Sequence, residues 1–223
     1  MIEFPLPELT QYADQRELVT ISDVIDPGFL VKNPDTQQFV MRVAGDPSAG
    51  DLGARLAEAE DRFSELLGVL RAQKHGRGER QVEMGRAPAR DEFGNQFVPV
   101  GTVREYARFP GAIEGFAAKA ASGMKESSAF REALRFFGRP NRDAADYYLV
   151  YELAEKEFGG WQGIRNRLGF SRAKLEEFKK SANHLAATSG GRHASGDPAT
   201  ATMNLDDISR FIREFMAAWV NVY

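Results

Sequence analysis

The sequence predicts an α+β protein with a small N-terminal part that contains a β-hairpin and a C-terminal antiparallel helical bundle. Apolar residues alternate with polar ones before residue 44, whereas from Leu52 they recur at the helical spacing of three or four. Glycines at 159, 160 and 169 then separate apolar helical stripes by very short connections, which favours antiparallel helices. We therefore expect an N-terminal α+β part (1–100), a helical connector (101–138) and a C-terminal helical bundle (139–223).

The first fifty residues have the pattern of strands and turns. The β-branched run Leu18–Ser22 predicts a strand, and Asp26-Pro27-Gly28 predicts a turn. Phe29–Lys32 and Gln38–Val43 flank the turn-forming segment Asn33-Pro34-Asp35-Thr36. We expect these two segments to pair as a hairpin.

A long helix is expected to follow and to pack against this hairpin. Its predicted apolar stripe consists of Leu52, Leu56, Ala59, Phe63, Leu66, Leu67 and Leu70. Residues 74–99 are rich in glycine, proline and arginine, with short strands expected at Gln81–Met84 and Gln96–Val100. His75 lies in this segment without an evident partner. The connector is helical in tendency, although Pro110 and three glycines interrupt its pattern.

The C-terminal elements have the clearest boundaries. Asp143–Phe158 predicts a helix that ends at Gly159, and Trp161–Leu168 predicts a short one that ends at Gly169. Ser171 caps a third helix that runs to about Thr188. Asn204 and Asp207 form the pattern of a capping box in front of the last helix. The stripe of this last helix ends in Trp219 and Val220, so we expect it to enter the core or a homodimer interface.

Composition excludes several classes of protein. The 223 residues are 43% hydrophobic and 27% charged, which is typical of a globular chain, and they include no cysteine. Disulfides and thiolate zinc sites are thereby excluded, and we expect neither a metal site nor a cofactor. No apolar run approaches the length of a membrane span, and the N-terminus lacks the pattern of a signal peptide. We therefore expect a cytoplasmic protein without a membrane partner.

Charge is distributed unevenly along the chain. Residues 1–70 carry 13 acidic and 5 basic side chains, a net charge of −8, whereas residues 156–192 carry 8 basic and 3 acidic ones, a net charge of +5. A polyanion such as RNA is one interpretation of the positive segment. The other is a solvated helical surface, and the sequence leaves both open.

The richest candidate site surrounds the end of the helix that follows Ser171. It contains two of the three histidines, His184 and His193, together with Arg192. An imidazole can transfer protons near neutral pH, and an arginine can stabilise charge on a phosphate, so these three residues are the candidate catalytic set. The alternative is structural, with Arg192 and His193 serving only to cap the preceding helix by binding its last carbonyl groups.

Other polar or flexible residues could bind a ligand beside this set. Gly190 and Gly191 would let backbone amides approach an anion, and Asn183 offers both a donor and an acceptor. On the preceding tyrosine-rich helix, Tyr148 and Glu152 complete the candidate ligand-binding residues. Several aromatic side chains of this region could stack on bases, although their helical spacing also fits core packing.

Four segments carry a resemblance to a group of uncharacterised prokaryotic proteins: residues 147–155, 178–183, 191–194 and 203–207. In that group a tyrosine–glutamate helix, a Ser/Thr-Ala-Asn helix end, an Arg-His-Gly/Ala loop and a closing helix follow one another. The resemblance covers roughly residues 134–221. A looser one is to HEPN-type domains, helical bundles that often dimerise and serve as ribonucleases or RNA-binding modules in defence systems. No arginine precedes His184 or His193 by four to six residues, as it does in those enzymes.

The looser resemblance implies RNA or another polyanion as partner, a homodimer, and a role in defence. A non-catalytic protein that interacts or assembles with a protein partner through its acidic N-terminal half is the alternative. The sequence does not decide whether the protein is an enzyme.

Overall fold

The protein is described by a computed structural model that confirms a mostly helical α+β fold. Its described part contains eight helices and a small antiparallel sheet. None of the described helices is long and apolar enough to span a bilayer. The residues that the structure describes are 2–6, 15–44, 52–75, 89–90, 96–97, 110–139, 142–188 and 202–223.

The sheet has three strands in the order β1-β3-β2, all antiparallel. They are β1 (Ile2–Leu6), β2 (Leu30–Lys32) and β3 (Phe39–Val43). The expected hairpin of β2 and β3 is confirmed, with Val31 opposite Val40. Val40 alternates with Phe39 and Met41 and is also buried, and Pro5 and Val31 of the neighbouring strands lie on either side of it. A separate pair of short strands, β4 (Ala89–Arg90) and β5 (Gln96–Phe97), lies in the glycine-rich segment, whose expected strand at residues 81–84 is outside the described residues.

The strand predicted at Leu18–Ser22 is wrong, since these residues belong to helix α1 (Gln15–Ile25). Leu18, Ile21 and Ser22 are the buried positions of this helix, and their spacing is helical. The Ser22 hydroxyl accepts a hydrogen bond from the Leu30 backbone N–H and so links α1 to β2. Packing of one helical face therefore outweighs the strand preference of this β-branched run.

Seven further helices follow, and those of the C-terminal part begin and end where the sequence predicts. They are α2 (Leu52–His75), α3 (Pro110–Glu126), α4 (Ser128–Gly138), α5 (Ala144–Phe158), α6 (Trp161–Leu168), α7 (Arg172–Thr188) and α8 (Leu205–Val220). Capping boxes at Asp143 and Asn204 open α5 and α8, and left-handed glycines at 159 and 169 close α5 and α6. Pro110 opens α3 instead of interrupting it, because the first helical position needs no N–H donor.

Helix α2 is the expected long helix, but its first two leucines do not join the core. Leu52 and Leu56 are 52% and 39% exposed, whereas the later members of the predicted stripe, such as Leu66 and Leu70, are buried. The sheet contacts α2 through β3, as expected.

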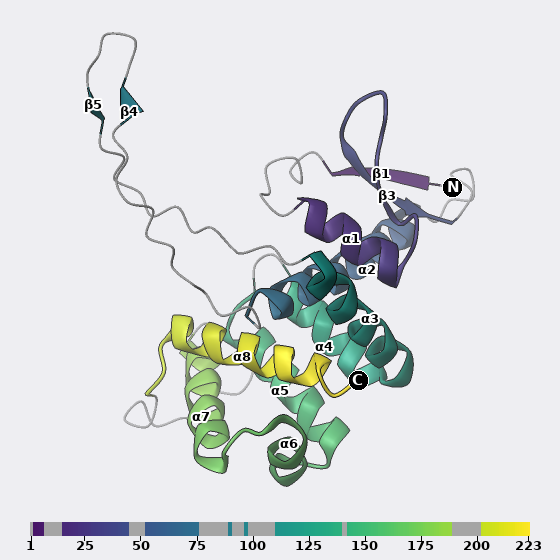
Figure 1. The fold of residues 1–223 in the computed structure, drawn as a ribbon. Helices are drawn as coiled ribbons and strands as arrows, with labels where there is room; N and C mark the ends of the chain where they lie inside the picture. Colours follow the sequence, from purple (N-terminus) through teal and green to yellow (C-terminus); the bar gives the residue numbers. More distant parts are fainter. Residues whose placement is uncertain are drawn as a thin grey trace.

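The helices pack around α2, α4, α5 and α8. Helix α4 packs chiefly on α2 and α5, while α8 contacts α2, α5 and α7. Figure 1 shows the sheet and α1 at one end of the molecule and α6 and α7 at the other. Buried apolar residues form one cluster that includes members on both sides of residue 139. The division into separate parts at that position stays a prediction.

Helices α2 and α4 cross so closely that glycine is required at two positions. A Cβ atom on Gly68 would overlap the carbonyl oxygen of Leu134, and one on Gly138 would overlap that of Ser64. Backbone therefore packs directly on backbone at this crossing.

Trp219 of α8 is fully buried at the centre of an aromatic cluster, which confirms that the last helix enters the core. Its ring centroid lies 5.3 Å from that of Phe130 on α4 and 5.4 Å from that of Phe158 on α5. Edge-to-face and tilted ring contacts of this kind stabilise the folded state beyond the gain from burying apolar area.

We expect Gly138→Ala to lower the free energy of unfolding by about 1–3 kcal/mol, because the added methyl group overpacks the α2–α4 crossing. Gly115→Ala on the open side of α3 is the matched control. It meets no atom and should stabilise the protein by up to about 1 kcal/mol. Equal effects of the two variants in denaturant unfolding would contradict the close crossing.

Trp219→Ala should cost about 3–5 kcal/mol, since it removes the largest fully buried side chain and leaves a cavity between three helices. Thermal and urea unfolding measure this loss. A loss below about 1 kcal/mol, the range of surface substitutions, would place the ring outside the core.

Candidate functional site

The structure places four of the predicted site residues on two packed helices. Tyr148 and Glu152 lie on α5, and Asn183 and His184 lie on α7, which packs against it. The remaining predicted site residues, Gly190, Gly191, Arg192 and His193, are outside the described residues. Whether the loop returns to His184 therefore stays a prediction.

Polar groups meet where α5 packs against α7. The Tyr151 hydroxyl donates a 2.8 Å hydrogen bond to the Glu155 carboxylate, whose two oxygens lie 3.5 Å from Lys179 Nζ. Burial, reinforced by this carboxylate, raises the pKa of Tyr151 far above its ordinary value. Burial also raises the pKa of Tyr148, against the opposing charge of Lys179. Both phenols therefore stay protonated at neutral pH and can donate hydrogen bonds.

The histidine of this region is not organised for acid–base chemistry by the residues around it that the structure describes. His184 and Asn183 are half-buried, and Glu152 is exposed. Within the described ranges these three side chains make neither a hydrogen bond nor an ion pair. The structure thus brings Tyr148 into the field of Lys179 and Glu152, but it does not join His184 to a carboxylate of α5.

Ser181, the first residue of the Ser-Ala-Asn segment, has a structural role that the sequence did not reveal. Its buried hydroxyl oxygen accepts hydrogen bonds from the backbone N–H groups of Thr202 and Met203, at 3.2 and 3.1 Å. The side chain of Thr202 in turn donates to Glu177. The segment before α8 is therefore fastened to the middle of α7.

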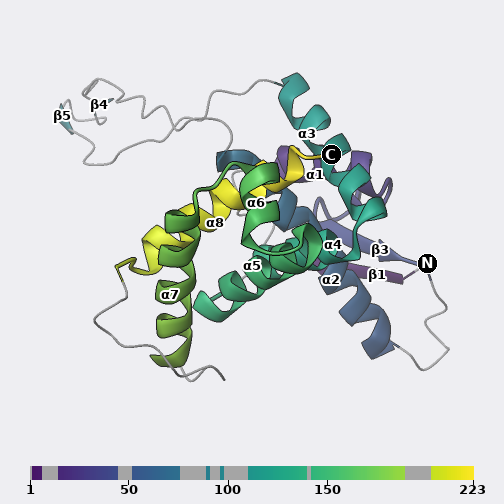
Figure 2. The ribbon, with the colours of Figure 1, turned by 90° about the horizontal axis from the view of Figure 1, so that it is seen from below.

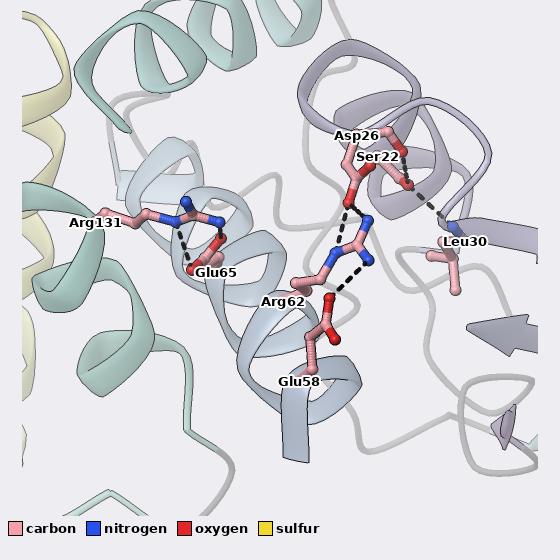
Figure 3. A network of polar contacts seen from close by, with 7 residues as sticks. All are labelled: Ser22, Asp26, Leu30, Glu58, Arg62, Glu65 and Arg131. Atoms are coloured by element: carbon pink, nitrogen blue, oxygen red, sulfur yellow. Dashed lines mark hydrogen bonds and ion pairs between the residues drawn. The ribbon is translucent and has the colours of Figure 1, made fainter. Parts of the chain in front are cut away.

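A second polar cluster, drawn in Figure 3, lines a hollow of about 600 Å³ among α1, α2, α3 and α4. Arg62 of α2 donates to the carboxylate of Asp26, which follows α1, through Nε at 2.7 Å and also through Nη2. The guanidinium carbon lies 4.4 Å from the ring centroid of Phe29, and Nη1 lies 3.7 Å from Glu58. Arg62 is thus held by two carboxylates and an aromatic ring.

One turn further along α2, Glu65 is nearly fully buried and is neutralised by α4. Arg131 binds it with two parallel hydrogen bonds of 2.9 and 3.1 Å, and Arg135 donates a third of 2.6 Å. The hydrogen bond to Glu65 raises the pKa of Arg131, so this guanidinium remains protonated. Because Asp26, Glu58 and Glu65 of this hollow already pair with arginines of α2 and α4, the cluster serves to position α2 against α1 and α4.

The cations of α6 and of the start of α7 differ from those of the hollow. Arg165 and Arg167 are exposed and form no ion pair within the described part of the chain. Arg172 is also exposed, and its guanidinium carbon lies 4.8 Å from the ring centroid of Trp161. Figure 2 shows α6 in front of the other helices, beside α7. We call the side chains of Arg165, Arg167 and Arg172 the α6–α7 arginine surface.

The fold presents this surface rigidly. Ile164 of α6 is fully buried, and Gly163 is required because a Cβ there would overlap the carbonyl oxygen of Phe158. In the turn between the two helices lies Phe170, whose ring centroid is 5.2 Å from that of Phe211 and 5.3 Å from that of Phe215 on α8. Sequence reasoning counted these arginines only within a longer positive segment. A better signal was available, since residues 161–175 contain four basic and no acidic side chains.

We expect Ser181→Ala to destabilise the protein by about 1–3 kcal/mol, because two backbone N–H groups lose their acceptor. The exposed Ser128 supplies the control, and Ser128→Ala should change the free energy of unfolding by no more than about 0.5 kcal/mol. Denaturant unfolding of both variants checks the expectation. A Ser181 variant as stable as the control would mean that water replaces the hydroxyl.

No protein-family model, no curated protein sequence and no solved structure matches this chain. The two resemblances given above therefore remain predictions. Among the residues that the structure describes, no three side chains of histidine, aspartate or glutamate gather as metal ligands would.

Proposed function

We propose that the protein binds RNA, or another polyanion, through the α6–α7 arginine surface. The observation that carries the proposal is a continuous segment, residues 161–175, with four basic side chains and no acidic one. Phosphate groups attract such a segment because each neutralised phosphate releases counterions into solution. Because the whole chain has a net charge of −3, a polyanion is repelled by the acidic parts of the surface and attracted to this local concentration of cations.

Ion pairs narrow the choice of cations. Within the segment, Lys174 Nζ lies 3.3 Å from Glu177, which leaves Arg165, Arg167 and Arg172 as the candidate ligand contacts. Arg62, Arg131 and Arg135 are each committed to a carboxylate in the hollow between α1, α2, α3 and α4. Lys179 faces Glu155. Arg165 and Arg167 have no such neighbour among the described residues, so a ligand phosphate would replace only water around them.

RNA is the first choice among polyanions because the looser resemblance is to HEPN-type domains, which bind or cleave RNA. We propose binding without cleavage. No arginine stands four to six residues before either histidine of the C-terminal part, and His184 makes no hydrogen bond to another described residue. The same resemblance implies a homodimer and a role in defence, and we propose these as well.

A specific feature favours the alternative, a protein that binds another protein through its N-terminal part. A largely apolar hollow of about 660 Å³ lies between the sheet and α2, next to the exposed Leu56. Its apolar lining comes from Phe4, Pro5, Met41, Leu56 and Phe63. Glu60 and Asp61 add two negative charges to the lining and Arg139 adds one positive charge. A partner with apolar and basic side chains would suit this hollow.

Binding to a labelled single-stranded RNA should weaken steeply between about 50 and 200 mM salt. The double variant Arg165→Gln/Arg167→Gln should bind more weakly, because fewer phosphates of the strand are neutralised. Its slope of log affinity against log salt should be shallower by about 0.7 for each phosphate that the variant no longer neutralises. Fluorescence anisotropy measures both quantities.

The control is Arg16→Gln/Lys32→Gln, which removes the same charge from exposed positions of the N-terminal part. It should leave affinity and slope unchanged. Equal effects of the two double variants would reduce the interaction to net charge. Absence of binding by the wild-type protein at low salt would overturn the proposal and leave the protein-binding alternative.

A further inference from the structure

The structure separates the aromatic side chains that belong to the core from those that reach the surface. Tyr147, Tyr151 and Trp219 are at most 4% exposed and are part of the core. Tyr148 and Trp161 are only half-buried, each packing one part of its ring against the core. Two aromatic side chains of α5 and α6 are therefore accessible to a ligand.

Trp161 has a basic neighbour on α7, and Tyr148 lies beside the ring of Tyr151, which has one as well. The Arg172 guanidinium carbon lies 4.8 Å from the ring centroid of Trp161, close enough for the two planes to interact. Lys179, whose side chain is 37% exposed, has its Nζ 5.7 Å from the ring centroid of Tyr151, and the Tyr148 ring centroid lies 6.5 Å from that of Tyr151. Arg172 joins an aromatic surface to a positive charge, and Lys179 adds a second charge that it shares with Glu155.

The basic members of the two pairs lie on one face of α7. Arg172 and Lys179 are seven residues apart, so they occupy the same face two turns apart, separated by roughly 10 Å along the helix. The aromatic members come from α5 and α6, which both pack on α7. A strand of nucleic acid that follows α7 from its N-terminus would meet first one pair and then the other.

We infer that the ligand of this surface is a single-stranded nucleic acid whose bases stack on the Trp161–Arg172 pair and on Tyr148. This inference rests on the proposed function and narrows it. A duplex hides the faces of its bases and offers only phosphates and groove edges, whereas an unpaired strand offers base faces to aromatic rings and to guanidinium planes. Alternation of aromatic and basic side chains is the arrangement by which proteins bind single strands without reading their sequence.

The test compares three probes at equal salt: a single strand of about 12 nucleotides in RNA and in DNA form, the RNA duplex of the same length, and linear polyphosphate, which has no bases. We expect the single strand to bind about tenfold more tightly than the duplex. It should also quench tryptophan fluorescence, and this signal reports on Trp161, because the only other tryptophan is Trp219, which is fully buried. Polyphosphate should bind without quenching.

Two variants separate stacking from charge. Trp161→Ala should lower single-strand affinity by about 5- to 100-fold and leave polyphosphate affinity unchanged. Arg172→Lys keeps the charge but not the planar group, and because Arg172 is exposed the variant should fold normally. It should weaken single-strand binding with an unchanged salt slope. Leu56→Ala, an exposed apolar truncation at the other end of the molecule, is the control and should change neither affinity.

The outcomes distinguish the inference from the function on which it rests. Equal affinity for strand, duplex and polyphosphate without quenching would overturn stacking and leave electrostatic binding in place. Tighter binding of the duplex would overturn the single-strand inference as well. If no probe binds at low salt, the proposed function fails together with the inference. A preference between the RNA and DNA strands would show whether the 2′-hydroxyl is read.

Discussion

The aromatic face of α8 holds the helical part together and sets the position of every other C-terminal element. Phe211, Phe215 and Trp219 repeat every four residues, so they form one ridge along the helix. Phe178 of α7 stacks on Phe211 with ring centroids 4.5 Å apart, and Phe170 inserts from the α6–α7 turn. Because this ridge fixes the turn, it also fixes the direction in which α6 points its arginines. Stability and the candidate surface thus depend on the same side chains.

Charge pairing divides the cations of the molecule into two groups. Those between α1, α2 and α4 neutralise carboxylates, among them the buried Glu65, whose desolvation requires the hydrogen bonds from Arg131 and Arg135. Arg62 and Glu65 lie one turn apart on α2 and carry opposite charges. Arg62 pairs with Asp26 after α1, whereas Glu65 pairs with Arg131 of α4, and the two pairs together favour one placement of α2. The exposed arginines of α6 and α7 take no part in this pairing. Apart from the contact of Arg172 with the ring of Trp161, these arginines can interact with water or with a ligand.

The sequence predicted the C-terminal helices well because caps, glycine stops and apolar stripes are local signals that agree with one another. It failed at Leu18–Ser22, where a β-branched run supports a strand locally but tertiary packing of Leu18 and Ile21 requires a helix. It also could not reveal why Gly68 and Gly138 are needed, since a close crossing depends on two helices that are distant in sequence. Leu52 is exposed for a similar reason: an apolar stripe predicts which face of α2 is buried, but not how far along that face the neighbouring elements extend.

A residue of a type that can bind a ligand is not always free to bind one, and the candidate site illustrates the difference. Histidines and a glycine pair drew attention to residues 183–193, of which the structure describes only Asn183 and His184 among the predicted set. For arginine, residue type alone says little, because five N–H donors serve a carboxylate of the same chain as readily as a phosphate. Whether Arg131 or Arg165 can bind a ligand depends on which acidic residues the fold places beside each of them. Availability is therefore a property of the packed structure. Among the described residues it favours the arginines of the short helix α6, while the predicted site at residues 190–193 stays a prediction.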